Sequence, residues 1–356
     1  MAKNTTDKVR NGRATPTSRP SDSLTKDTLL EMYWKMLLSR RVDERAWMIH
    51  RQGKIVFHIS AIGQEAIQVA AAYTIHLGVD YIVPYYRDLA LVLCAGVTPE
   101  DFMISLYGKE GELSSLARQM PSHFGAKPFN IVSTSAPVAT QVVHAAGMAF
   151  AIKYRIQNEL QDPNDRTQPR LAVTSLGEGS TSQGEWHEAM NWAGVHQLPF
   201  ICIVQNNHYA ISVPVDKQMA VPNVADRAAA YGVEGIIVDG NDVLACYDVM
   251  HYAVQKAYRG DGPTLIEAKT YRMTPHSSDD DDRTYRERSE VDAWRDKDPL
   301  LRLANHLKAQ GLLTDAVIEG YDKRARKIVD EAQRAAEERP YPPGESAIAP
   351  VYAEAN

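Results

Sequence analysis

Cysteine is scarce in this chain, with three residues among 356. Cys94, Cys202 and Cys246 are far apart and form no C-x-x-C pair, so we expect reduced structural thiols, as in a cytosolic protein. An excess of positive charge is also missing, because the net charge is -6. This balance argues against nucleic acid or an anionic membrane surface as a partner. No apolar run is long enough for a transmembrane helix.

The chain also lacks the common glycine-rich nucleotide motifs. Its nearest approach is G-x-G-x-x-x-x-G over Gly177, Gly179 and Gly184, which fails the dinucleotide fingerprint, and no Walker motif occurs. A nicotinamide-dependent dehydrogenase with its own nucleotide-binding domain is therefore disfavoured.

Residues 1–23 are polar and have no apolar signal-peptide core. Arg10, Arg13 and Arg19 would suit a mitochondrial transit peptide, but Asp7 and the missing apolar face favour a flexible N-terminal segment of a bacterial cytoplasmic protein. The mitochondrial matrix is the alternative location.

Helical and strand patterns alternate through the rest of the chain. Such alternation predicts an α/β fold with a mostly parallel sheet and helices on both faces. We expect helices over 24–51, 63–77, 137–154 (with Pro137 at its first position), 185–196, 224–231 and 243–258, then two more between 299 and 339. Strands are expected over 81–86, 171–176, 200–205, 235–238 and 264–271. The length allows one or two domains.

One strand-helix-strand unit carries polar residues just after each of its strands. Glu178 follows the first strand and Asn207 the second, which places both at the carboxyl edge of a parallel sheet, where ligands bind. The Glu178 carboxylate, the Asn207 amide oxygen and the Tyr209 carbonyl could complete the oxygen shell of Mg²⁺ together with two phosphate oxygens and a water. Gly177 and Gly179 would let the backbone approach the phosphates. The unit predicts a metal-diphosphate site.

The same unit resembles the GDG-to-NN signature of thiamin diphosphate enzymes, with Glu in place of the usual Asp. The segments PYYRD (84–88), ARQMPSHFGAKPFNIVSTSAPVATQ (117–141) and TYRMTPHSSDDDDRTYR (270–286) are similar to the alpha subunit of the decarboxylating first component of 2-oxoacid dehydrogenase complexes, branched-chain type. The resemblance implies the thiamin diphosphate-binding fold. It also implies one domain over 24–340, between the N-terminal segment and an irregular C-terminal tail over 341–356.

The resemblance implies further cofactor contacts. Tyr86 and Arg87 would lie against the diphosphate, while the Ala136 carbonyl and Val138 would lie under the aminopyrimidine. Ser180 and Gln205 complete the expected cofactor-binding residues, although branched-chain relatives often have Arg at position 205. Four residues match positions that hold a structural K⁺ in such relatives: Ser135, Pro137, Thr140 and Gln141.

A lone histidine beside the acidic run 279–282 would ordinarily belong to a solvated loop. Here His276 resembles the catalytic histidine of the loop that covers the cofactor. Ser277 matches a serine that is phosphorylated in mitochondrial relatives, and the residues expected to hold the loop are Arg272, Asp280, Tyr285 and Arg286. The positions matching the substrate entrance are Phe57, Tyr86 and His123.

The implied function is thiamin diphosphate- and Mg²⁺-dependent oxidative decarboxylation of a 2-oxoacid, followed by acyl transfer to a lipoyl group. The implied partners are a beta subunit, in an α₂β₂ heterotetramer, and a lipoyl-bearing acyltransferase as second component. The beta subunit would supply the glutamate that activates the cofactor. The alternatives are a pyruvate or acetoin dehydrogenase alpha subunit and, in another class, a nonenzymatic homologue.

Overall fold

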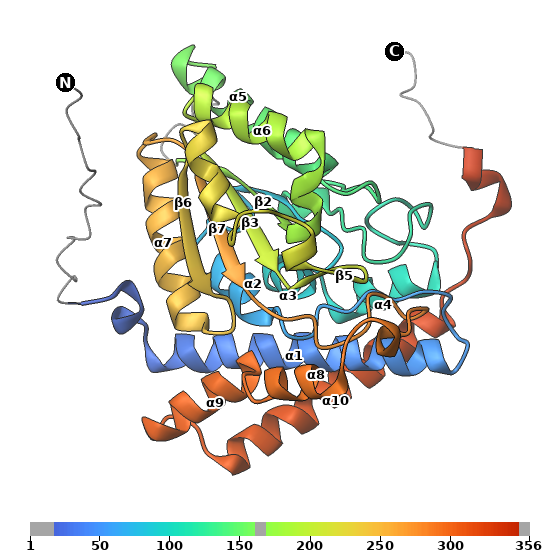
Figure 1. The fold of residues 1–356 in the computed structure, drawn as a ribbon. Helices are drawn as coiled ribbons and strands as arrows, with labels where there is room; N and C mark the ends of the chain where they lie inside the picture. Colours follow the sequence, from blue (N-terminus) through green and yellow to red (C-terminus); the bar gives the residue numbers. More distant parts are fainter. Residues whose placement is uncertain (1–17, 161–168, 349–356) are drawn as a thin grey trace, which may run out of the picture.

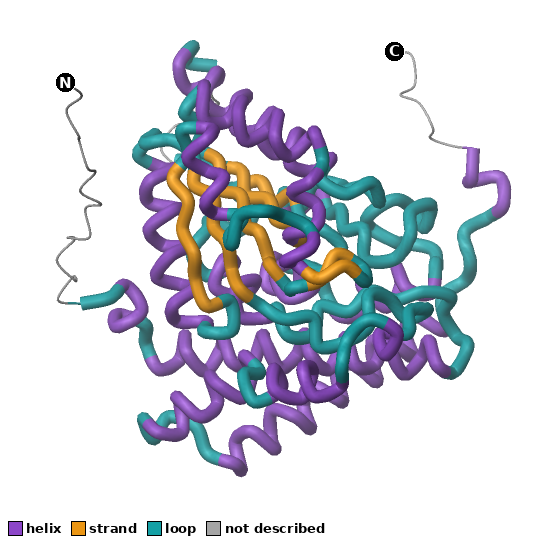
Figure 2. The backbone as a smooth tube through the Cα atoms, viewed as in Figure 1, coloured by secondary structure: helices purple, strands orange, loops and turns teal. Residues whose placement is uncertain are grey.

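The computed structural model describes residues 18–160 and 169–348. Its centre is a five-stranded parallel sheet in the order β1-β2-β3-β7-β6 (Figures 1 and 2). The strands are β1 (Tyr81–Val83), β2 (Ala172–Gly177), β3 (Phe200–Asn206), β6 (Glu234–Asp239) and β7 (Thr264–Lys269). Every residue of the central strand β3 is buried, as expected for a strand covered on both faces. The predicted fold class is confirmed.

Helices cover both faces of the sheet (Figure 1). Alternate strand residues face opposite sides, so Ile201 and Ile203 pack into one core while Cys202 and Val204 pack into the other. The first core contains α1 (Lys26–Arg51), α2 (Glu65–Ala72), α3 (Leu89–Ala95) and α7 (Val243–Tyr258). The second contains α5 (Thr140–Gln157) and α6 (Gly184–Val195).

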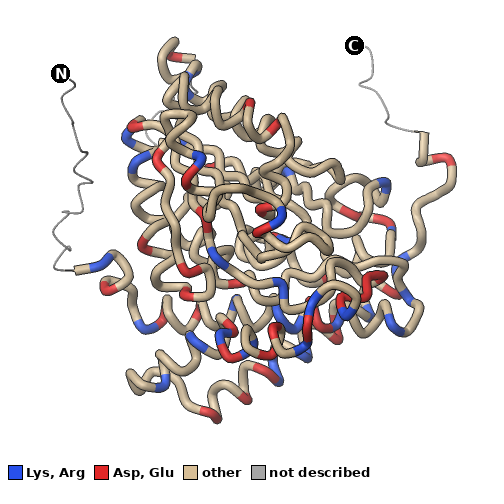
Figure 3. Tube along the Cα trace, in the orientation of Figure 1, with Lys and Arg blue, Asp and Glu red and all other residues tan. Residues whose placement is uncertain are grey.

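An outer layer of helices extends the first core. It consists of α4 (Pro99–Tyr107), α9 (Pro299–Ala309) and α10 (Asp315–Glu338). Helix α8 (Arg288–Arg295) packs through Val291 and Trp294 into a small separate core with Tyr209, Tyr271 and Met273. Helix α10 packs along α1 and α4 (Figure 1). Basic and acidic residues are interspersed along these outer helices (Figure 3). In the described ranges no helix combines the length and apolar character that a membrane span requires.

Short elements complete the chain. A hairpin of β4 (Tyr209–Ala210) and β5 (Val213–Pro214) follows β3. The 3₁₀ turns are η1 (Pro20–Ser23), η2 (Lys127–Phe129), η3 (Glu178–Ser182), η4 (Val215–Lys217), η5 (Ala225–Tyr231), η6 (Asp282–Thr284) and η7 (Gly344–Ile348). The three cysteines are free thiols.

Several predicted boundaries were wrong. Pro137 does not begin a helix, because the backbone turns at Ala139 (φ 72°) and α5 starts only at Thr140. The helix predicted over 63–77 spans only Glu65–Ala72, and the one predicted over 224–231 is the 3₁₀ turn η5.

The folded unit also begins before residue 24. Ser21 is buried, its backbone N–H donates to Asp248 on α7 at 2.7 Å, and the Arg19 guanidinium pairs with the same carboxylate at 2.6 Å. Much of the predicted N-terminal segment and the end of the predicted tail lie outside the described residues.

Candidate active site

The carboxyl ends of β2 and β3 open onto a cavity of about 350 Å³. The structure brings twelve of the predicted residues to its wall: Tyr86, Arg87, His123, Ala136, Val138, Gly177, Glu178, Gly179, Ser180, Asn207, Tyr209 and His276. Strands β2 and β3 are parallel neighbours, so Glu178 and Asn207, which directly follow them, lie together at the carboxyl edge of the sheet.

Glu178 is a buried carboxylate without a counter-ion in the part of the chain that the structure describes. One of its oxygens accepts from the Asn207 backbone N–H at 3.0 Å, and the other accepts from Gln218 Nε2 at 3.4 Å. Burial raises the pKa of Glu178 above its ordinary value, and these hydrogen bonds oppose that rise. A buried carboxylate that makes no ion pair, with only the more distant charge of Arg272 to balance it, favours a bound cation.

The oxygen donors around Glu178 suit Mg²⁺. Asn207 Oδ1 and the Tyr209 carbonyl also lie at this wall, and their present partners are the Tyr209 N–H at 3.4 Å and Arg272 Nη1 at 3.2 Å. Among the described residues no three His, Cys, Asp or Glu side chains gather around a common point. The site would therefore combine one carboxylate with an amide and a carbonyl oxygen, which is the hard donor set that Mg²⁺ accepts.

The two glycines of the Gly-Glu-Gly turn have different roles. A Cβ at Gly179 would lie 2.4 Å from the Ala210 Cβ, so only glycine lets η3 approach the β4 hairpin. A Cβ at Gly177 would meet its nearest neighbour, Asn207, at an ordinary 3.7 Å. Both glycines were predicted to leave room for phosphates. At Gly179, close packing against the hairpin is a second explanation for the glycine.

Arg87 and His276 meet at the opposite part of the wall. The buried Arg87 guanidinium donates to the Ser60 carbonyl at 2.5 Å, to the His276 carbonyl at 2.9 Å and to His276 Nδ1 at 3.2 Å. Burial, with Arg87 and Arg272 nearby, lowers the pKa of His276 to about 4. The imidazole is therefore neutral at pH 7, accepts at Nδ1 and carries its proton on Nε2.

The loop after β7 is held from both ends. Asp280 accepts from the His276 backbone N–H at 2.7 Å and from the Tyr285 hydroxyl at 2.5 Å, and that hydroxyl accepts from Arg272 at 2.9 Å. Arg286 donates to the Arg272 carbonyl at 2.5 Å. The four residues predicted to hold the loop thus form one connected network.

Ser277 lies inside this loop and is buried. Its hydroxyl accepts from the Asp279 backbone N–H at 3.4 Å, and its carbonyl accepts from the Asp280 N–H at 3.2 Å. The loop would have to open before a kinase could reach this hydroxyl.

A cluster of oxygens lies beside the cavity at the start of α5. The Ser135 and Thr140 hydroxyls hydrogen-bond to each other, and Thr140 also donates to the Pro137 carbonyl at 2.9 Å. Gln141 is turned toward the sheet, where its Nε2 donates to the Ser175 carbonyl at 3.0 Å. The oxygen atoms of Ser135, Pro137 and Thr140, three of the four residues predicted to bind K⁺, therefore lie close together.

Two predicted residues do not reach the cavity wall. The Gln205 side chain is buried below it, donating to Asp88 at 2.6 Å and accepting from Gln68 at 3.0 Å. Phe57 lies outside, because the chain first reaches the wall at Ile59. Asp88 is fully buried, and burial raises its pKa to about 6.

Sequence reasoning missed four wall residues: Ile59, Met120, Ala210 and Ile211. Ala210 and Ile211 directly follow Tyr209, so they could have been included from the position of that predicted ligand. Ile59 and Met120 have no such signal, because they come from segments whose path depends on tertiary packing.

Comparison with known proteins gives a consistent result. A profile described as "Dehydrogenase E1 component" matches residues 33–345. The chain is 48% identical to the 2-oxoisovalerate dehydrogenase subunit alpha of Bacillus subtilis, over 93% of this chain and 97% of that protein. It is 37% identical to the 3-methyl-2-oxobutanoate dehydrogenase subunit alpha of Mycobacterium tuberculosis, covering 96% and 88%. It is 36% identical to the pyruvate dehydrogenase E1 component subunit alpha of Staphylococcus aureus, covering 88% and 79%.

Proposed function

The chain belongs to the dehydrogenase E1 component family, and from this premise we propose that it is the alpha subunit of a branched-chain 2-oxoacid dehydrogenase. The proposed reaction is thiamin diphosphate-dependent oxidative decarboxylation with acyl transfer to the lipoyl group of the second component. The observation that carries this proposal is the cavity in which Glu178, Asn207, Arg87 and His276 converge. The relative with 48% identity supports the branched-chain substrate class.

Each part of the cavity has a role in this proposal. Glu178, Asn207 and the Tyr209 carbonyl would hold Mg²⁺, and Arg87 would bind phosphate oxygens. When bound, thiamin diphosphate supplies the nucleophilic carbon and the electron sink for decarboxylation. Ser135, Pro137 and Thr140 would hold a K⁺ ion beside it, with Gln141 in support through the sheet.

His276 would serve acyl transfer. Its Nε2 carries the proton, because Nδ1 is occupied as the acceptor of Arg87. An anionic diphosphate beside Arg87 would offset the positive charges that lower the pKa of His276. The imidazole would then be a better proton donor and acceptor near neutral pH when the cofactor is bound.

The cavity is incomplete without a partner. Glu178 is the only carboxylate on its described wall and is assigned to the metal, which supports assigning the second carboxylate, to activate the cofactor, to another chain. We assign this group to a beta subunit in an α₂β₂ heterotetramer, which would hand the acyl group to a lipoyl-bearing acyltransferase. The relatives of higher identity are bacterial, and we place the complex in the bacterial cytoplasm.

Reconstitution with the beta subunit tests the proposal. The isolated chain with saturating thiamin diphosphate and Mg²⁺ should be inactive, and activity should appear when beta is added. The kinetic constant kcat/KM should be higher for the 2-oxoacids derived from valine, leucine and isoleucine than for pyruvate. Activity of the purified chain alone would contradict the shared site, and a preference for pyruvate would favour the pyruvate dehydrogenase alternative.

Substitution of His276 tests its separate role. His276→Ala should reduce acyl transfer to a lipoyl domain by more than it reduces decarboxylation measured with an artificial electron acceptor. Equal losses in the two assays would count against a dedicated role in acyl transfer.

A further inference from the structure

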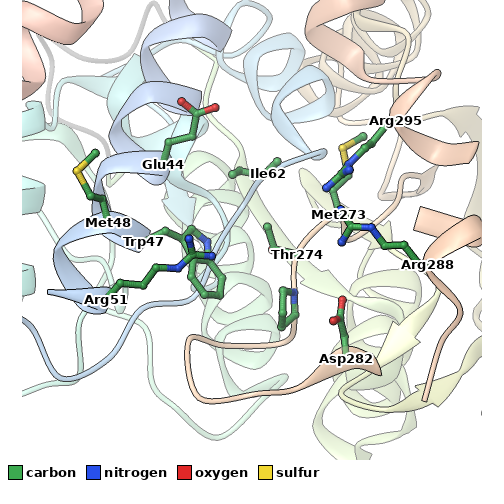
Figure 4. A pocket seen from close by; sticks show the side chains of 11 residues that line it. Glu44, Trp47, Met48, Arg51, Ile62, Met273, Thr274, Asp282, Arg288 and Arg295 are labelled. Atoms are coloured by element: carbon green, nitrogen blue, oxygen red, sulfur yellow. The ribbon is translucent and has the colours of Figure 1, made fainter. Parts of the chain in front are cut away.

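A second cavity, of about 640 Å³, lies against the segment Met273–Pro275, which immediately precedes His276 (Figure 4). It lies between α1, this segment and α8, and its wall shares no residue with the cavity described above. Its volume is in the range of sites that bind small organic molecules.

Guanidinium groups stand on two sides of this second cavity. Arg51 lies at one side, and Arg288 and Arg295 lie at the other (Figure 4). Within residues 18–160 and 169–348 Arg51 makes no ion pair, while Arg288 and Arg295 share the single carboxylate of Asp292 at 3.4 and 3.0 Å. Three cations against one carboxylate leave a local surplus of positive charge on a chain whose net charge is -6.

The two acidic residues of the wall do not cancel this surplus. Glu44 is paired with Arg41 at 2.6 Å, and Asp282 is paired with Arg286 at 2.5 Å. Each carboxylate is therefore already paired with a cation outside the wall. Arg41 also pairs with Asp322 at 2.5 Å, but Arg326 in turn pairs with Asp322 at 2.7 Å.

The remaining wall is largely apolar. Trp47, Ile62 and Met273 contribute an indole ring, a branched aliphatic chain and a thioether (Figure 4). We propose that this cavity binds an organic carboxylate with an apolar body. Its head would pair with Arg288 and Arg295 on one side, since guanidinium groups bind carboxylates through paired hydrogen bonds, and Arg51 on the other side would add a more distant attraction. Its body would cover the apolar wall.

Such a ligand would act directly on the loop that carries His276. Thr274 Oγ1 and Trp47 Nε1 are buried without a hydrogen-bond partner in the described part of the chain. Unpaired buried polar atoms cost free energy, so a bound acceptor favours turning these side chains toward it. Thr274 lies two residues before His276, so a ligand that holds its hydroxyl would restrict the segment leading into the loop.

Trp47 offers a second route to the same loop. Its ring lies edge-on against His58, with centroids 5.9 Å apart. The His58 backbone is joined to Ser278 in both directions, by His58 N–H to Ser278 Oγ at 3.0 Å and by Ser278 N–H to the His58 carbonyl at 2.9 Å. Occupancy of the cavity is therefore coupled to the loop on both sides of His276, and we infer that the ligand regulates the order of this loop.

The test measures binding directly, so it does not depend on the proposed reaction. Radiolabelled octanoate is dialysed to equilibrium against the full chain assembled with its partner. Saturable binding is expected, and Arg51→Glu and Arg295→Glu should each weaken it by about threefold or more, the loss expected when an exposed attractive charge becomes repulsive. The matched control is Arg259→Glu on the exposed Arg259 after α7, which should leave binding unchanged. Arg51 and Arg295 are exposed, so these variants should fold normally.

Three further measurements separate the outcomes. Glu178→Ala should retain octanoate binding, and loss of binding there would assign octanoate to the other cavity and overturn the proposal. Competition by inorganic phosphate at equal concentration, or equal binding by all arginine variants, would overturn it as well. Octanoate should also slow protease cleavage within 272–288 in wild type but not in Arg295→Glu, and unchanged cleavage in both would refute the coupling to the loop.

Discussion

Glu178→Gln should make the cofactor-free protein more stable while abolishing its response to cofactor. Glu178 is a buried carboxylate that makes no ion pair among the described residues, and burial raises its pKa although the charge of Arg272 opposes the rise. The substitution removes the charge and keeps an oxygen that can accept from the Asn207 N–H. The new amide also gains a potential acceptor, because Gln218 Oε1 is buried without a partner in the described chain.

The sizes of the two effects decide which protein is more stable. Relief of one poorly compensated buried group is worth about 1–3 kcal/mol in the free energy of unfolding. Cofactor at about 100 times its Kd adds about 2.7 kcal/mol to a protein that binds it, and nothing to one that does not. Without cofactor Glu178→Gln should therefore exceed wild type in stability, and saturating thiamin diphosphate with Mg²⁺ should cancel or reverse that order.

The pH dependence gives an independent check of the cause. A carboxyl whose folded pKa is raised contributes stability below its ordinary value of 4.5 and loses it as the pH rises through the folded pKa. The advantage of Glu178→Gln should thus be absent below about pH 4.5 and grow toward pH 8. The assay is the melting temperature at fixed subunit concentration, with and without cofactor, and exposed Glu188→Gln on α6 is the control. A cofactor-free variant less stable than wild type at pH 8 would refute the burial argument.

Four further substitutions test the site. Arg87→Gln should raise the pKa of His276 from about 4 toward 6.5. NMR of the imidazole should then show protonation of His276 at a higher pH than in wild type. A pKa that stays near 4 would show that burial alone lowers it. Because the folded pKa is lowered, protonation of His276 opposes folding as the pH falls from 6.5 to about 4, and this loss should shrink in the variant. Tyr285→Phe should speed protease cleavage of the loop by about thirtyfold through loss of two hydrogen bonds, each worth about 1 kcal/mol, with unchanged cleavage as the contrary result. Gly179→Ala should lower stability by about 1–3 kcal/mol in thermal melts, while Gly177→Ala should stay within about 1 kcal/mol of wild type, and equal losses would contradict the packing difference.

The regular part of the fold was predictable from local pattern. The central strand was predicted over 200–205 and spans Phe200–Asn206, and the predicted helix 243–258 matches α7. Long periodic or apolar runs of this kind predict the type of element well, because the pattern of apolar residues matches the pattern of burial in the folded chain. Helix α3 was not predicted, because a short run that is apolar on every side has no periodicity.

Local signals could have identified one more helix. Thr98 and Asp101 form a reciprocal cap at the start of α4, Pro99 occupies its first turn, and Gly108 ends it in a left-handed conformation. The same kind of signal misled at Pro137, because proline also suits a turn before a helix. Caps identify ends reliably only where the flanking pattern is already helical.

Gln205 was predicted to bind the cofactor from the resemblance in sequence, but its side chain does not reach the cavity. Ile201, Ile203 and Gln205 lie two residues apart on β3, so all three face the core that contains α2. There Gln68 of α2 meets Gln205, and Gln68 Nε2 also donates to the Arg87 carbonyl at 2.9 Å. The two-residue period of the strand could have indicated which face of the sheet Gln205 lies on. Which helix covers that face depends on tertiary packing and could not be predicted.

This arrangement changes the role that Gln205 can have toward the diphosphate. Its amide donates to Asp88, the neighbour of Arg87, instead of reaching the cavity. An arginine at position 205 would place a guanidinium beside the buried Asp88 carboxylate, whose pKa burial raises to about 6, and would favour its charged form. With glutamine there, positive charge on the described cavity wall comes from Arg87 alone, and Gln205 supports that residue from below through Asp88 and Gln68.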